Sequence, residues 1–254
     1  MIFTYSQIES YLLCGEAYRR TYIEGEREAT CRMHIGSSVA RVSRRDSMEK
    51  LAGARCLSLK ESVDIGVEAF EQLVESRPVS DPENIANGSN HAAGASRAFH
   101  TRVSPVLKDV THAEERWGAE IELPDGLGKV VFEGTPDTVL EGAISDQKTG
   151  RRWRPEEARK NRQLPLYSLL FFAKYGLWPR ALYIDNIFRV KGSKYDAQRL
   201  EAPNSAKAVN ACVQLLATVK RGIDAGVFAP PGIGSRKCSQ KQCGYYNSCV
   251  YIGD

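Results

Sequence analysis

Apolar residues recur with the period of a helix through most of the first half of the chain. Near the start, Ile8 and Leu12 lie four residues apart on one helical face, and Ser6 is a suitable N-cap residue. A polar, turn-rich loop is predicted over residues 78–90. Helices are predicted over residues 4–25, 34–53, 62–77 and 91–107.

The pattern changes near Trp117, where short β-prone runs alternate with Asp-Gly, Gly-Leu-Gly and Glu-Gly turn signals. This pattern predicts a strand meander that continues to Gly150. A helix, a strand and a last long helix are predicted over residues 154–176, 180–190 and 205–226. The order of elements indicates one α/β domain with a helical insertion. We divide it into a mainly helical lobe, an α/β core and a C-terminal tail, at residues 1–115, 116–230 and 231–254.

Length and composition fit a globular protein that buries a full core. The chain has 254 residues, 42% of them hydrophobic. No apolar run approaches the length of a membrane span, and the first ten residues lack a signal-peptide pattern, so a cytoplasmic protein is expected. The formal charge of +4 argues only weakly for nucleic acid. No phosphate-binding loop of the Walker type occurs, and no Ser/His/Asp arrangement stands out.

Two aspartates and a lysine interrupt the apolar strand pattern. Because strand side chains alternate between faces, Asp146 and Lys148 point the same way, Gln147 points the opposite way, and a hairpin brings Asp137 beside the pair. Two converging carboxylates repel unless a cation lies between them, and Mg²⁺ prefers oxygen ligands. The alternative is a surface hairpin with an ion pair, which composition alone favours.

The following helix carries two more polar residues on one face, because Gln163 and Tyr167 are four positions apart. Together these residues resemble the motifs of the PD-(D/E)XK nuclease superfamily, specifically its RecB-like exonuclease branch. The resemblance rests on Gly134, Asp137, Asp146, Gln147, Lys148, Thr149, Gly150, Gln163 and Tyr167.

The resemblance implies a restriction-endonuclease-like core with a mixed central sheet flanked by helices. It also implies that Asp137, Asp146 and the backbone carbonyl of Gln147 bind Mg²⁺ or Mn²⁺. Lys148 would position the attacking water, and Gln163 and Tyr167 would orient the lysine, the water or the strand.

Seven cysteines without an export signal are not expected to form disulfides, because the cytosol keeps thiols reduced. Three of them, Cys238, Cys243 and Cys249, gather near the end of the chain. Such a group of cysteines usually indicates metal binding. The spacing does not distinguish zinc from iron. The resemblance implies a [4Fe-4S] cluster held by these three residues together with Cys14, as in the CRISPR-adaptation type of nuclease. We expect Cys31, Cys56 and Cys212 to be ordinary thiols.

The sequence departs from the family pattern on the early helix. Members commonly carry Gly-x-x-x-His there as a further metal ligand, whereas Gly36 is followed by Ala40. His34 precedes that glycine, and a lone histidine is more often structural. Glu115 is a candidate supplementary acid.

Basic residues lie near the predicted site. Residues 150–163 hold six Lys or Arg and also Trp153, which could stack on a base, although a solvated helix start explains them equally well. Weaker candidates for contacts with nucleic acid are Arg19, Arg20, Tyr18, Tyr22, Arg236, Lys237 and Lys241.

The expected function is a metal-dependent DNA exonuclease that acts on single strands or DNA ends. The alternatives are a weak or inactive DNA-end-binding scaffold and a zinc-stapled binding module. A helicase, an integrase or a recombination complex is a possible partner, and a phage or mobile element is a possible origin.

Overall fold

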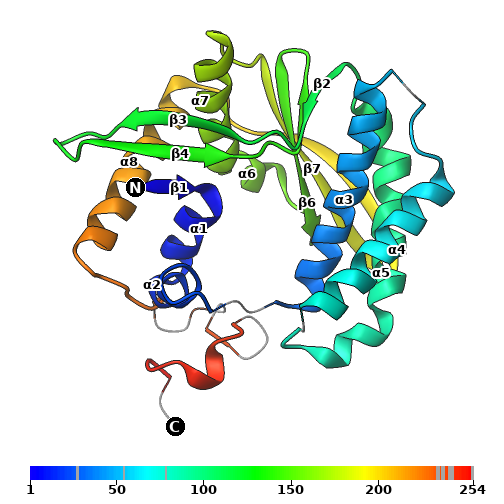
Figure 1. Cartoon of the computed structure of the whole chain (residues 1–254), viewed down its shortest axis with the longest axis horizontal. Helices are drawn as coiled ribbons and strands as arrows, with labels where there is room; N and C mark the ends of the chain where they lie inside the picture. The colour runs from blue at the N-terminus through cyan, green and yellow to red at the C-terminus, as the bar shows by residue number, and fades with distance from the viewer. Residues whose placement is uncertain are drawn as a thin grey trace.

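The structure is a computed structural model that describes residues 1–26, 29–53, 55–77, 79–232, 235, 238–239 and 243–252. At its centre lies a five-stranded mixed sheet (Figure 1). The strand order is β2 (Val110–Ala113), β5 (Thr138–Leu140), β6 (Ala143–Gly150), β7 (Ala181–Lys191) and β8 (Lys194–Glu201). β6 and β7 pair in parallel, and the other neighbours are antiparallel.

A second sheet of three strands extends to one side. Its hairpin consists of β3 (Trp117–Glu122) and β4 (Lys129–Gly134), and β1 (Ile2–Thr4) pairs in parallel with β4. Burial alternates along β4, where Val130 and Phe132 face the core, as expected of a half-buried strand.

Three helices form a lobe on one side of the main sheet: α3 (Cys31–Leu51), α4 (Leu59–Ser76) and α5 (Gly88–Ala98). α3 packs on β2 and β6, and α5 packs on β8. The lobe has its own apolar cluster, in which Val39, Phe70 and Phe99 are fully buried.

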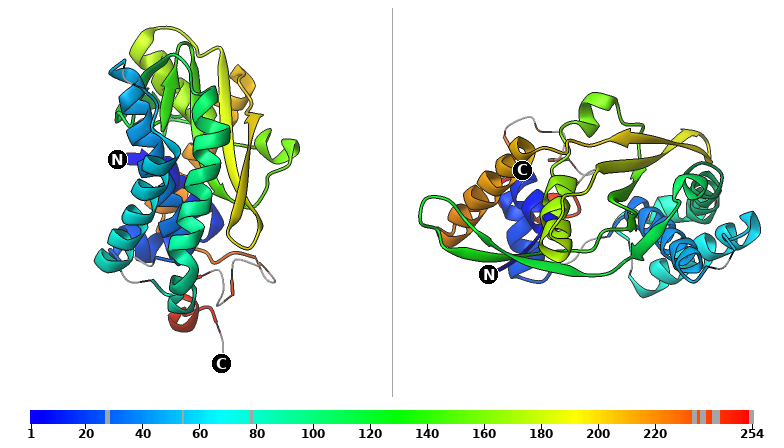
Figure 2. Two further views of the ribbon diagram at one scale, coloured as in Figure 1. Left: turned by 90° about the vertical axis from the view of Figure 1, so that its right-hand side faces the viewer. Right: turned by 90° about the horizontal axis from the view of Figure 1, so that it is seen from above.

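The remaining α-helices pack away from this lobe, as the view from above shows (Figure 2). They are α1 (Tyr5–Leu13), α2 (Gly15–Tyr18), α6 (Pro155–Ala158), α7 (Gln163–Tyr175) and α8 (Ala206–Asp224). α7 contacts both sheets, and α8 packs against α7 and α1. Phe3, Ile8, Phe132 and Leu164 join the larger apolar cluster here. The first 115 residues are therefore divided, since α1 and α2 lie apart from the lobe of α3, α4 and α5.

The α/β class with mixed sheets and flanking helices is confirmed, whereas several boundaries were wrong. Thr4 rather than Ser6 caps the first helix, and that helix breaks at Cys14, whose backbone is extended. A short 3₁₀ helix, Pro82–Asn87, lies in the predicted loop. Helix 91–107 ends in a π turn and a 3₁₀ turn, Phe99–Val103 and Ser104–Val106. Helix 154–176 divides into α6 and α7, and β1, β2 and β8 were missed.

None of the helices in the described part of the chain combines the length and apolar character that a membrane crossing requires.

Candidate active site

Strand β6 carries the acid and the lysine on one face. Lys148 Nζ lies 2.6 Å from Asp146 Oδ2, and the Asp146 side chain is only 2% exposed. Gln147 points the other way, toward α3, where its Oε1 accepts a hydrogen bond of 2.8 Å from Ser43 Oγ. The strand alternation therefore separates the two faces as the sequence predicted.

The pairing of β5 with β6 brings the second aspartate to the first. Thr138 stands opposite Ser145 in this antiparallel ladder, so the preceding residue, Asp137, comes beside Asp146. Asp137 Oδ2 accepts a hydrogen bond of 2.6 Å from the backbone N–H of Gln147. This bond fixes the Asp137 carboxylate next to β6.

A chain of hydrogen bonds connects the lysine to helix α7. Lys148 Nζ donates to Gln163 Oε1 at 2.7 Å, and Gln163 Nε2 donates to the Tyr167 hydroxyl at 2.9 Å. That hydroxyl lies 3.4 Å from the Thr135 carbonyl oxygen. A Cβ at Gly134 would lie 2.4 Å from Tyr167 Cε1, so only glycine lets the ring approach β4 this closely. The structure thus brings Asp137, Asp146, Lys148, Gln163 and Tyr167 together.

Burial perturbs the charges of this group. Burial first, and then the charge of Asp146, raises the pKa of Asp137 to about 8. Burial also raises the pKa of Asp146, although Lys148 opposes that effect. Burial acts to lower the pKa of Lys148, but the two aspartates outweigh it, and that pKa is raised. The site therefore holds two acids and one charged lysine, of which Asp146 is buried and Asp137 and Lys148 are half-buried.

The donor set fits a hard divalent cation with incomplete protein coordination. Asp146 Oδ2 meets Lys148 and has no further hydrogen bond among the described residues, which leaves lone pairs for an ion. Within the same ranges, no three His, Cys, Asp or Glu side chains gather closely enough to form an ion site alone. Mg²⁺ tolerates this, because it binds through one or two carboxylates and keeps several waters.

Helix α3 turns a face without metal-ligating side chains toward this group. Ser43 and Ser47 on that face contact Gln147 and Thr138, and Ala40 lies one turn before Ser43. His34 is 3% exposed, and its Nε2 lies 2.8 Å from the Arg77 carbonyl oxygen, which is a structural contact.

The adjacent residues Glu114 and Glu115 make different contacts near the site. Glu115, the acid expected from the sequence, pairs with Lys174 at 2.5 Å, and that hydrogen bond lowers its pKa. Glu114 was missed. The ladder that pairs Ala113 with Thr138 places Glu114 next to Asp137, and its charge contributes to the raised pKa of Asp137. Its φ of 53° is rare outside glycine, and such strain gathers at functional sites. The Glu-Glu dipeptide was the only signal in the sequence.

The four cysteines of interest line one small cavity. Cys14, Cys238, Cys243 and Cys249 surround about 30 Å³ of space, together with Pro230, Pro231, Tyr246 and Ile252. Burial raises the pKa of the Cys14 and Cys243 thiols. Cys14 Sγ also accepts a hydrogen bond from the backbone N–H of Ala17 at 3.4 Å.

The other three cysteines lie elsewhere. The thiols of Cys31 and Cys212 each donate to a backbone carbonyl at 3.4 Å, from Asn84 and Arg162, and Cys56 is exposed.

The basic segment has an exposed and a tethered part. Exposed cations lie in the segment that leads into α7: Arg151, Arg152, Arg154, Arg159, Lys160 and Arg162. Three of them pair with Glu156 or Glu157 of the same segment. Trp153 is held in place, because its backbone N–H donates to Asn186 Oδ1 at 2.8 Å, its backbone carbonyl accepts from Gln198 Nε2 at 2.7 Å and its side chain packs on the core. Tyr18 is buried against Phe228. Arg236, Lys237 and Lys241 lie outside the described residues.

Comparison with solved structures supports the fold. A structure described as a "putative exonuclease" from Eubacterium rectale is 12% identical, with a TM-score of 0.58, over 99% of this chain and 89% of that chain. The protein SSO0001 is 14% identical over 71% and 83%, with a TM-score of 0.33. LHK-Exo in complex with dAMP is 17% identical over 76% and 94%, with a TM-score of 0.26. The last two scores are too low to support a shared fold.

Comparison at the level of sequence assigns the family. A search of curated proteins finds no match. The family model of the PD-(D/E)XK nuclease superfamily matches residues 2–250, which include every residue of the acid and lysine group and all seven cysteines. The chain therefore belongs to the PD-(D/E)XK nuclease superfamily.

Proposed function

We propose that the protein is a metal-dependent deoxyribonuclease of the RecB-like branch that removes nucleotides from DNA ends. The observation that carries this proposal is the placement of Lys148 Nζ between Asp146 and Gln163, at 2.6 and 2.7 Å, with Asp137 beside them. An ammonium group held by two acceptors keeps a donor for a water molecule or a phosphate oxygen.

The residues divide the work of phosphodiester hydrolysis. Asp137, Asp146 and the Gln147 carbonyl would hold Mg²⁺ or Mn²⁺, which when bound polarises the phosphate and lowers the pKa of water. Lys148, kept charged by the aspartates, donates to the water or to the phosphate and offsets negative charge that develops there. Gln163, itself oriented by Tyr167, fixes the position of the lysine.

DNA is the expected substrate because exposed cations lie in the segment that leads into α7, whose first residue is Gln163 of the site. Action at DNA ends, rather than within a strand, is supported by the description of the similarly folded Eubacterium rectale protein as a "putative exonuclease". A helicase, an integrase or a recombination complex remains our proposed partner.

We further propose that Cys14, Cys238, Cys243 and Cys249 bind a [4Fe-4S] cluster. All four residues line one cavity, and thiolates are the usual ligands of such a cluster. Zinc bound by four cysteines is the alternative. Iron and zinc analysis with a visible spectrum tests this: a brown protein with iron supports the cluster, and a colourless protein with zinc contradicts it.

A DNA-end-binding scaffold is the second candidate, favoured by Ala40 on the helix face where a metal ligand would lie. End-labelled single-stranded DNA with Mn²⁺ distinguishes the two candidates. If the protein is a nuclease, wild type degrades the DNA and Asp146→Asn does not. If it is a scaffold, wild type binds the DNA without degrading it. Equal degradation by wild type and Asp146→Asn would show a contaminating nuclease.

A further inference from the structure

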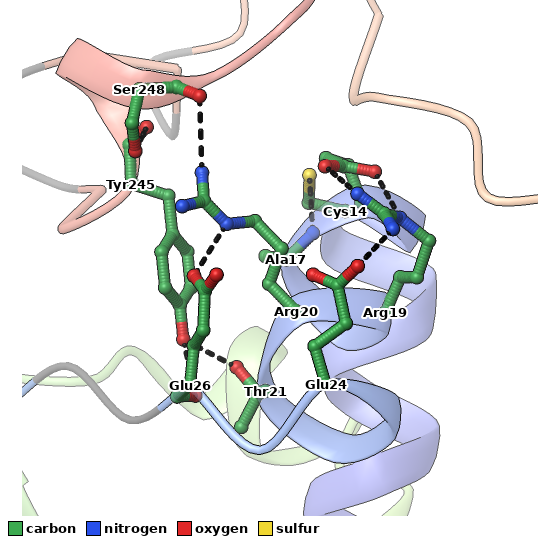
Figure 3. Close-up of polar contacts among 10 residues, drawn as sticks. Cys14, Ala17, Arg19, Arg20, Thr21, Glu24, Glu26, Tyr245 and Ser248 are labelled. Atoms are coloured by element: carbon green, nitrogen blue, oxygen red, sulfur yellow. Dashed lines mark hydrogen bonds and ion pairs between the residues drawn. The ribbon is translucent and has the colours of Figure 1, made fainter.

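The two ends of the chain meet through one arginine near the N-terminus. Arg20 Nε pairs with Glu26 at 2.7 Å, and Arg20 Nη1 donates to the Ser248 carbonyl oxygen at 3.3 Å (Figure 3). Its guanidinium also lies over the Tyr245 ring, with its carbon 4.6 Å from the ring centroid. Only 14% of this charged side chain is exposed. Arg20 thus holds the tail by a cation–π contact with Tyr245 and by a hydrogen bond to Ser248.

Tyr245 makes the reciprocal contacts from the tail. Its hydroxyl donates to the Glu26 carbonyl oxygen at 2.8 Å and lies 2.8 Å from Thr21 Oγ1. The residue is 8% exposed, although it lies within ten residues of the C-terminal end of the printed sequence. A buried, doubly hydrogen-bonded tyrosine fixes the tail in one orientation.

These contacts lie between the cysteines without using any of them. Tyr245 and Ser248 fall between Cys243 and Cys249, and Arg20 follows Cys14 by six residues. Backbone contacts just before the tail also join the two segments. Gly15 N donates to the Ala229 carbonyl oxygen at 2.8 Å, and a Cβ on Gly15 would lie 2.8 Å from Phe228 and Ala229 backbone atoms. The tail is therefore docked by groups that do not bind metal.

The two adjacent arginines of this segment make different contacts. Residues Arg19–Ile23 form a π-helical turn, a rare conformation that is frequent at functional sites. In this turn Arg19 pairs with Glu16 and Glu24 of its own segment, whereas Arg20 crosses to Tyr245 and Ser248.

We propose that Arg20 and Tyr245 form a latch that preforms the four-cysteine cavity before metal enters. The inference rests on the proposed metal role of the cysteines, and both residues act as positioning residues. A preformed site binds more tightly, because the cost of ordering the tail is already met by other contacts. Metal is then lost faster when the latch is broken.

The first test measures metal release from the purified protein with excess chelator. We expect Arg20→Gln to release metal about tenfold faster, which corresponds to about 1.4 kcal/mol. Arg20→Lys and Tyr245→Phe should show smaller increases, since each keeps part of the latch. Arg19→Gln is the matched control and should stay within about twofold of wild type. Equal release from Arg20→Gln and Arg19→Gln would overturn the proposal.

The second test uses metal-free protein, so that it does not depend on which metal binds. Trypsin has cleavage sites at Arg236, Lys237 and Lys241, and mass spectrometry follows loss of the fragment beyond them. The latch predicts slow loss from wild type and Arg19→Gln, and at least several-fold faster loss from Arg20→Gln. Equal rates in all three would show that the tail is not held by the latch.

The two proposals fail in different ways. Zinc in place of iron, or no metal at all, would contradict the cluster while the proteolysis rates still separate Arg20→Gln from Arg19→Gln. Conversely, a brown protein whose tail is cut equally fast in every variant would keep the cluster and remove the latch.

Discussion

The acid and lysine group and the cysteine cavity are built in opposite ways. The first draws its residues from positions 137–167, and the register of neighbouring strands places Asp137 beside Asp146. The second joins Cys14 to residues near the other end of the chain, through contacts such as Arg20 to Ser248 that span 228 positions. One site follows from local backbone geometry, whereas the other depends on docking of a tail. We therefore expect them to fail separately.

The largest effect should come from Lys148→Ala. This change removes the side chain that bridges Asp146 and Gln163, and with it a donor for the developing phosphate charge. We expect a loss of about 10²- to 10³-fold in the rate of DNA degradation. The metal content of the cysteine cavity and the stability of the tail contacts should stay unchanged, because the cavity lies outside this group.

Cys249→Ser should break the cysteine cavity and spare the acid group. Removing one thiolate opens the shell of a bound metal, so iron or zinc content should fall and thermal stability with it. Cys56→Ser, at an exposed cysteine outside the cavity, is the control and should match wild type. Retention of full metal content by Cys249→Ser would contradict the assignment of this cysteine.

Stability in the absence of divalent ions should depend on pH through Asp137. The folded protein raises the pKa of this carboxyl from 3.8 to about 8, so between these values the folded state keeps a proton that the unfolded chain has released. Stability then falls as pH rises through this window. Melting temperatures measured in chelator should be lower at pH 8 than at pH 5, and Asp137→Asn should flatten the difference. A curve with the same slope in the variant would exclude Asp137 as its source.

The smallest predicted effect distinguishes two adjacent glutamates. Glu114→Gln removes a charge that contributes to the raised pKa of Asp137, so the pH dependence should move to lower pH by less than about one unit. Glu115→Gln should leave it in place, because Lys174 already neutralises that acid. Identical shifts in the two variants would contradict a specific effect of Glu114 on the pKa of Asp137.

Sequence patterns predicted the residues whose neighbours are set by short-range geometry. Alternation on β6 separates Lys148 from Gln147, and helical spacing brings Gln163 to Tyr167. Glu114 could not be found in this way, because it needs the register of β2, a four-residue strand of mixed polarity.

Long-range contacts account for the other misses. The break at Cys14 leaves the apolar pattern unchanged, since it is a change of backbone angles near residues from the far end of the chain. The contact between Arg20 and Tyr245 likewise joins two polar segments that carry no periodic signal.

Calorimetric titration with Mn²⁺ tests most directly whether the paired aspartates share an ion beside Lys148. Wild type and Glu115→Gln should bind with the same affinity, and Asp137→Asn and Asp146→Asn should each bind at least about tenfold more weakly, because each loses one of two carboxylate ligands. Equal affinity in all four proteins would contradict the shared ion and the hydrolytic role built on it.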